Sequence, residues 1–80
     1  MTVRHLQLTF PESQVTEPVI YQIVKQFDVV PSIRRANISN HVGWMVIEVS
    51  GSTEALDAAI DYLEGLGIVV SDASGDIVAG

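Results

Sequence analysis

Leu6-Gln7-Leu8-Thr9-Phe10-Pro11 is the stretch from which the fold of this chain can be worked out. Apolar and polar side chains alternate along it, as they do in a β-strand with one buried face. We therefore expect a strand over residues 4–10, with Leu6, Leu8 and Phe10 in a core and the intervening side chains on the opposite face. Pro11 ends the strand, because proline cannot donate to a sheet ladder.

A helix is expected next, over residues 16–27. Thr16 is a suitable N-cap, and Pro18 falls in the first turn, where its missing N–H costs nothing. One apolar stripe at helical spacing indicates the face that packs on a sheet. It consists of Ile20, Ile23, Val24 and Phe27.

A second strand is expected over residues 32–39, after a short link at residues 29–31. Its apolar residues change parity between Ile33 and Ala36, which indicates a β-bulge or a twist. The segment 40–43 then turns the chain.

The second half of the chain repeats this plan. We expect a strand over residues 44–50, with Met45, Ile47 and Val49 facing the core. A helix follows over residues 53–66, with Ser52 or Thr53 as its N-cap, and Gly67 suits a left-handed C-cap. The last strand is expected over residues 68–71.

The order βαββαβ predicts an α+β, ferredoxin-like domain. Right-handed crossovers place both helices on one face of a four-stranded antiparallel sheet, with strand order 4-1-3-2. We assign residues 1–72 to this domain and expect residues 73–80, rich in small side chains, to form a loose tail.

Composition narrows the function classes. Ten acidic residues stand against four basic ones, and a net charge of −6 opposes binding to nucleic acid or to an anionic membrane surface. No apolar run approaches the roughly 20 residues that span a bilayer. The chain has no cysteine, which excludes disulfides, and only 18% of its residues are charged. We expect a cytoplasmic domain with no membrane insertion whose apolar surface favours an oligomer.

No constellation of residues points to catalysis. His5 and His41 belong to different elements, and no spacing typical of a zinc site occurs. The glycines do not form a phosphate-binding loop. We therefore expect no enzyme activity, no metal and no cofactor; a small enzyme is the weakest of the hypotheses.

Two candidate sites stand out. The face of strand 44–50 that points away from the helices would carry Trp44, Val46 and Glu48, and a tryptophan there is typical of an interface. The alternative is that Trp44 packs over Arg34 or His5. The strand 32–39 is expected at the sheet edge, and arginines there either bind a carboxylate or keep the edge soluble. The candidate ligand-binding residues are Ser32, Arg34, Arg35, Asn37 and Ile38.

The order and spacing of these segments, which include Glu-Pro-Val-Ile at residues 17–20, resemble those of the NIL domain, a module of bacterial methionine importer ATPase subunits. The resemblance covers about residues 3–71. Ser32 stands where the family often has asparagine, and Arg34 where an apolar residue is usual. The matching positions are Leu6, Leu8, Phe10, Glu17, Pro18, Val19, Ile20, Phe27, Val29, Ile33, Ile38, Gly43, Glu48, Gly51, Leu63 and Gly67.

The resemblance implies a regulatory domain that forms a homodimer and binds methionine or a similar amino acid. The alternative is an interaction adaptor that docks on a transporter or an enzyme without a small ligand. Ligand-induced stabilisation separates these two hypotheses.

Overall fold

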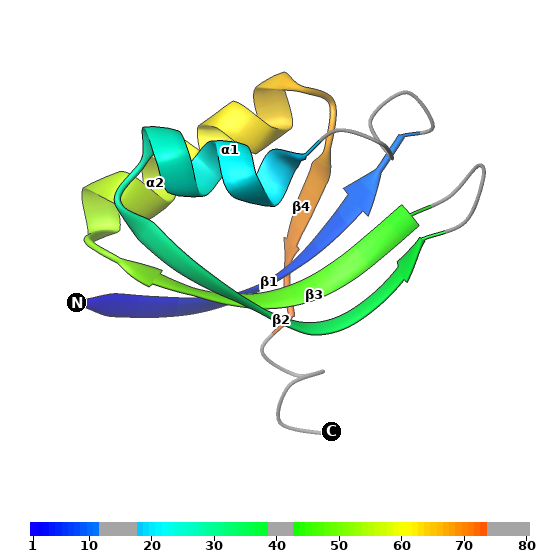
Figure 1. Ribbon diagram of the computed structural model, residues 1–80, viewed down its shortest axis with the longest axis horizontal. Helices are drawn as coiled ribbons and strands as arrows, with labels where there is room; N and C mark the ends of the chain where they lie inside the picture. The colour runs from blue at the N-terminus through cyan, green and yellow to red at the C-terminus, as the bar shows by residue number, and fades with distance from the viewer. Residues whose placement is uncertain (12–17, 39–42, 74–80) are drawn as a thin grey trace.

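The computed structural model describes residues 1–11, 18–38 and 43–73 of the chain. Its elements are β1 (Thr2–Phe10), α1 (Val19–Gln26), β2 (Val29–Ile38), β3 (Gly43–Gly51), α2 (Thr53–Gly65) and β4 (Val69–Asp72). The strands form one antiparallel sheet in the order β2-β3-β1-β4, and both helices lie on the same face of it (Figure 1). The predicted fold and strand order are confirmed.

The core lies between the sheet and the two helices. Leu6, Leu8 and Phe10 are buried, as the alternation along β1 predicted. Ile47 and Val49 of β3 are buried on the same face, and the helices contribute further apolar side chains. The buried helical residues are Val19, Ile23, Leu56, Ala59 and Leu63.

Val24 departs from the predicted helical stripe, because 46% of its surface is exposed. The buried face of α1 is centred on Val19 and Ile23. Val24 lies about 100° around the helix from Ile23 and therefore falls beside that face. The predicted helix start and its N-cap, Thr16, lie outside the described residues.

The ends of α2 follow the sequence signals. Ser52 Oγ accepts a 3.1 Å hydrogen bond from the backbone N–H of Ala55, so Ser52 rather than Thr53 is the N-cap. Gly67 has φ of +89°, the left-handed conformation predicted for it. Ala73 follows β4 and is buried. Neither described helix has both the length and the apolar character needed to cross a membrane.

β2 begins at Val29, which corrects the prediction of a link at residues 29–31. Val29, Val30 and Pro31 pair with β3. Proline is tolerated here because β2 is an edge strand and can turn the position of the missing N–H outward. The predicted bulge is present as a register shift between Ile33 and Arg35.

Candidate functional site

The bulge in β2 places two arginines on the same face of the sheet. Consecutive side chains of a strand normally point to opposite faces, and a bulge interrupts that alternation. Arg34 bonds Glu48, and Arg35 lies over Trp44, so both guanidinium groups lie on the face without helices, the open face. Ser32 and Asn37 share it, because they pair with Glu48 and Trp44.

Glu48 is held by two basic side chains from the strands on either side of it. Arg34 Nη2 donates a 2.8 Å hydrogen bond to Glu48 Oε2, and His5 Nε2 lies 3.3 Å from the same oxygen. The Arg34 hydrogen bond is the largest cause that lowers the pKa of Glu48 from its ordinary value of 4.5, and the His5 bond adds to it. Three strands are thus linked through one carboxylate.

Trp44 is half-buried beneath a cation. The guanidinium carbon of Arg35 lies 6.0 Å from the centroid of its ring, at the outer limit of a cation–π contact. The sequence suggested Arg34 or His5 as the side chain over Trp44; the structure places Arg35 there. The predicted interface and the predicted ligand site therefore form one continuous surface.

Val46, the third residue of the predicted interface, is buried in the single chain. It lies on the open face between Trp44 and Glu48, yet its exposed fraction is 0%. Val46 sits on an inner strand, opposite Gln7 of β1 and Arg35 of β2, so longer side chains surround it on both sides. The alternation of side chains along the strand predicts the face on which Val46 lies, but it does not predict this burial.

The free edge of β2 is highly exposed. Residues 32–37 are all exposed, and Ile33 keeps 54% of its surface accessible although it points to the helix-bearing face. Ile38 pairs through its backbone with Gly43. The predicted turn with His41 lies outside the described residues.

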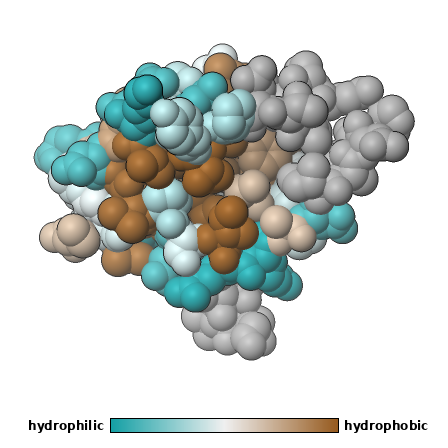
Figure 2. Space-filling view, in the orientation of Figure 1, coloured by the Kyte–Doolittle hydropathy of each residue, from teal (hydrophilic) through white to brown (hydrophobic). Residues whose placement is uncertain are grey.

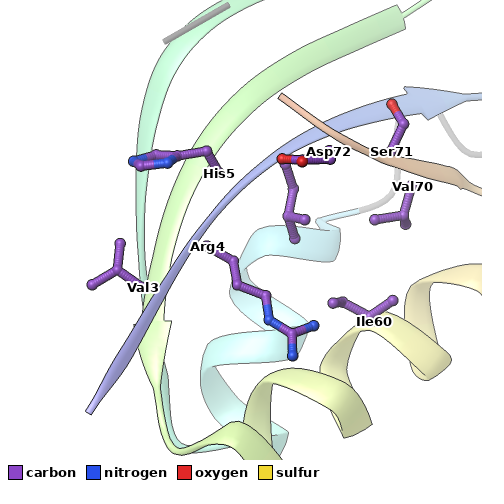
Figure 3. Close-up of a pocket in the computed structure, with 8 residues that line it drawn as sticks. Val3, Arg4, His5, Ile60, Val70, Ser71 and Asp72 are labelled. Atoms are coloured by element: carbon purple, nitrogen blue, oxygen red, sulfur yellow. The ribbon is translucent and has the colours of Figure 1, made fainter. Parts of the chain in front are cut away.

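A pocket at the opposite edge of the sheet went unnoticed in the sequence. It has a volume of about 430 Å³ and lies between β1, β4 and α2 (Figure 3). The signal was Arg4, a charged residue at the core-facing parity of β1. Arg4 Nη2 lies 3.0 Å from Asp57 Oδ1 of α2. Eight residues line the pocket: Val3, Arg4, His5, Leu6, Ile60, Val70, Ser71 and Asp72.

Among residues 1–11, 18–38 and 43–73, no three histidine or acidic side chains gather closely enough to hold a metal ion. The open face instead offers guanidinium groups, a hydroxyl and an indole, which recognise carboxylates, peptides or aromatic groups.

Comparison with known proteins agrees with the fold and with the sequence pattern. The profile of the NIL domain matches residues 4–72. The chain belongs to the NIL domain family. This NIL domain is 29% identical over 68 residues to the methionine import ATP-binding protein MetN from two strains of Helicobacter pylori. The match covers 80% of the chain but only 21% of each relative, so the chain spans about a fifth of their length.

A solved structure shows the same arrangement. It is the C-terminal domain of an ABC transporter ATP-binding protein from Enterococcus faecalis, which superposes with a TM-score of 0.78 at 27% identity. The superposition covers 89% of this chain and 83% of that domain. This chain therefore shares its fold with the C-terminal domain of a transporter ATP-binding protein.

Proposed function

We propose that this NIL domain is a non-enzymatic regulatory module that acts as a homodimer and binds a small amino-acid-like ligand. Methionine is the first candidate, because the H. pylori relatives are named as methionine import proteins. A cytoplasmic location follows from a partnership with a transporter ATPase. The observation that carries the proposal is the long, exposed edge strand β2.

The edge strand supports a dimer. β2 has ten residues, and among the strands that the structure describes it pairs with β3 alone, so its outer backbone groups can pair with a second strand. Apolar surface gathers between α1 and the strands beneath it (Figure 2). Val24 on α1 and Ile33 on β2 are both about half exposed on this helix-bearing side. A two-fold axis along β2 would extend the sheet and cover such side chains.

The open face supports a ligand with a carboxylate. A two-fold axis along β2 brings the Ser32, Arg34 and Arg35 side chains of two copies together. Arg34 already bonds Glu48, but a guanidinium carries five N–H donors and can hold a second carboxylate. Arg35 adds a second guanidinium on the same face.

The alternative function is an adaptor that docks on a transporter or another enzyme through the open face. Trp44, half-buried under Arg35, is the observation that favours it, because tryptophan and arginine are enriched where interfaces derive their affinity. This adaptor would need no small ligand.

Two measurements test the proposal. Light scattering should give twice the chain mass at micromolar concentration. L-methionine at 100 times its dissociation constant should stabilise the fold by about 2.7 kcal/mol, which raises the melting temperature by roughly 10–20 °C in a domain of this size. D-methionine and L-lysine serve as matched controls. A monomer at high micromolar concentration contradicts the dimer, and a dimer with no thermal response to any amino acid favours the adaptor.

A further inference from the structure

We propose that the β1–β4 edge of the sheet binds an extended peptide that ends in an apolar residue with a free carboxylate. The peptide would add a short parallel strand beside the first residues of β1, where β4 no longer covers that strand. Its last side chain would enter the pocket between β1, β4 and α2. β2 forms the opposite edge, so this site is separate from the seam proposed above and stands or falls independently of it.

β1 extends beyond the strand that covers it on this side. It has nine residues, whereas β4 has four and pairs with β1 only from Leu6 to Thr9. Past that pairing, the N–H of Ala73 donates a 2.9 Å hydrogen bond to the carbonyl of His5. The residues of β1 before His5 therefore have β3 on one side and no described strand on the other.

Val3 directs its backbone groups to this uncovered side. The N–H and C=O of one strand residue point to the same neighbouring strand, and the direction alternates from residue to residue. The carbonyl of His5 points to the β4 side, so the groups of Val3, two residues earlier, point there as well. Within the part of the chain that the structure describes, no backbone group bonds to them. One donor and one acceptor can thus take part in strand addition, a mode by which sheet edges bind extended peptides.

The pocket lies beside this edge and has an apolar lining. Leu6, Ile60 and Val70 supply that lining, and its volume of about 430 Å³ falls within the roughly 300–1,000 Å³ that is usual for ligand sites. Figure 3 shows Arg4 pointing toward α2 and Ile60 pointing from α2 toward the strands. Opposite residues of neighbouring strands share a face, so a peptide residue opposite Arg4 would direct its side chain into the pocket.

Charge and space together select a C-terminus as the occupant. β4 and Ala73 take up the next positions along the same edge, so an added strand ends beside Arg4. Arg4 bonds Asp57 through one guanidinium nitrogen at 3.0 Å and has further N–H donors. A peptide parallel to β1 brings its carboxylate to this cation, and such charged pairs form strong hydrogen bonds. An antiparallel peptide would bring its ammonium group there, which Arg4 repels.

Parallel pairing assigns the backbone bonds. In a parallel pair, a residue bonds the two residues that flank its opposite partner. With the last peptide residue opposite Arg4, the N–H of that residue donates to the carbonyl of Val3. The N–H of Val3 donates to the carbonyl two residues earlier in the peptide.

The test compares probes that each lack one of these interactions. The reference is acetyl-Thr-Thr-Val-Thr-Leu with a free carboxylate. One analogue carries a C-terminal amide, and another is N-methylated at its last peptide bond. The fourth probe, 4-methylpentanoate, keeps the terminal side chain and the carboxylate without a strand.

Methyl NMR of the full chain follows the binding. Leu6, Ile60 and Val70 report on the pocket, and Ile33 reports on the β2 edge. We expect the reference peptide to shift the pocket methyls saturably and to slow hydrogen exchange of the Val3 N–H. The amide and 4-methylpentanoate should bind at least roughly tenfold more weakly, and the N-methylated peptide at least roughly threefold more weakly.

Two variants separate binding from folding. Arg4→Gln should weaken binding of the reference peptide at least roughly tenfold and leave binding of the amide unchanged, because the lost interaction is the one with the carboxylate. Asp57→Asn breaks the same surface pair but leaves the pocket lining intact, so it should preserve or strengthen binding. Thermal melts check that both variants fold.

Several results would overturn the site. They are pocket methyls that do not move at millimolar peptide, shifts confined to Ile33, and equal affinity of the acid and the amide. Binding of 4-methylpentanoate as tight as that of the peptide would mean a pocket for a small anion.

The free chain provides one more check on the occupant. Slow exchange of the Val3 N–H without peptide, at every protein concentration, would mean that the chain covers this edge itself. Slow exchange at high concentration alone would assign the edge to a second copy. Either result overturns the peptide site, and neither bears on whether methionine binds at the β2 seam.

Discussion

Arg34 Nη2 lies 2.8 Å from Glu48 Oε2 and joins the bulge of the edge strand β2 to the inner strand β3. Arg34 reaches Glu48 from a position that regular alternation would place on the other face. The bulge thus determines which groups the open face presents. Arg34 bonds a carboxylate of its own chain, and the guanidinium carbon of Arg35 lies 6.0 Å from the centroid of the Trp44 ring.

The first prediction concerns the titration of Glu48. Its pKa is lowered, chiefly by the Arg34 hydrogen bond and then by His5. The ionised carboxylate therefore favours the folded state above pH 4.5, and this contribution is lost as the pH falls through the lowered pKa. Arg34→Gln should move the pKa of Glu48 back toward 4.5, as followed by ¹³C NMR of the carboxyl group.

Arg35→Gln is the matched control for that titration. It removes the same charge from the next residue, but Arg35 is not among the causes that lower the pKa of Glu48. The titration of Glu48 should stay as in the wild type. Equal effects of the two variants would mean that general charge, rather than the hydrogen bond, sets the pKa.

The second prediction compares two isoleucines that face each other in the sheet. Ile33 and Ile47 are register partners, but Ile33 is 54% exposed and Ile47 is fully buried. Ile47→Ala should lower the free energy of unfolding by about 2–5 kcal/mol, because it leaves a cavity in the core. Ile33→Ala should cost less than about 1 kcal/mol within a single chain. Urea denaturation at low protein concentration measures both, and equal losses would contradict the assigned faces of the sheet.

The third prediction concerns two glycines. A Cβ at Gly51 would lie 2.9 Å from the backbone carbonyl oxygen of Asp28, whereas a Cβ at Gly65 meets nothing within 4 Å. Gly51→Ala should destabilise the fold by about 1–3 kcal/mol through crowding against the backbone. Gly65→Ala should be neutral or stabilising by up to about 1 kcal/mol, since alanine is the better helix former. Thermal unfolding of the two variants under identical conditions measures both effects. If Gly51→Ala is as stable as the wild type, the backbone at Asp28 can shift to make room for the added methyl group.

Local patterns predicted the fold because each element agrees with its neighbours. The alternation of Leu6, Leu8 and Phe10 fixes the inner face of β1, and Ser52 and Gly67 mark the ends of α2. The start of β2 was missed because Pro31 looks like a strand breaker when the direction in which its backbone nitrogen points is unknown. That direction depends on which edge of the sheet the strand occupies, which is a property of the whole fold.

The sites were harder to predict than the fold. The sequence indicated the polar cluster on β2, but it could not show that Arg34 bonds Glu48 or that Val46 is covered. The pocket at β4 depends on where β4 stops along β1, which only the register reveals. Arg4 at an inward position of β1 was the local signal. In the structure it pairs with Asp57 and lines the pocket together with Asp72.

The last prediction tests the β2 edge, and the strand register decides which residue to change. The backbone N–H and C=O of His5 point to β4, so those of the next residue, Leu6, point to β3. Ile47 of β3 is the partner of Leu6, and its backbone groups point to β1. The backbone groups of alternate residues of β3 therefore bond to β2. Trp44, the partner of Asn37, is one of these residues. The N–H of Asn37 therefore points inward, toward β3. Ala36, its neighbour, points its N–H to the outer edge.

Ala36→Pro should leave the fold intact, because an outward N–H is no loss to the sheet, and should abolish a dimer that forms through β2. Asn37→Pro should instead destabilise the single chain, because it removes a bond of the β2–β3 ladder. Light scattering gives the mass of each variant, and urea denaturation gives its stability. Because both variants introduce proline at adjacent positions, comparing them separates the loss of an outward edge donor from the loss of a hydrogen bond between β2 and β3. A dimer that survives Ala36→Pro would place the interface elsewhere, with the Trp44 face as the next surface to change.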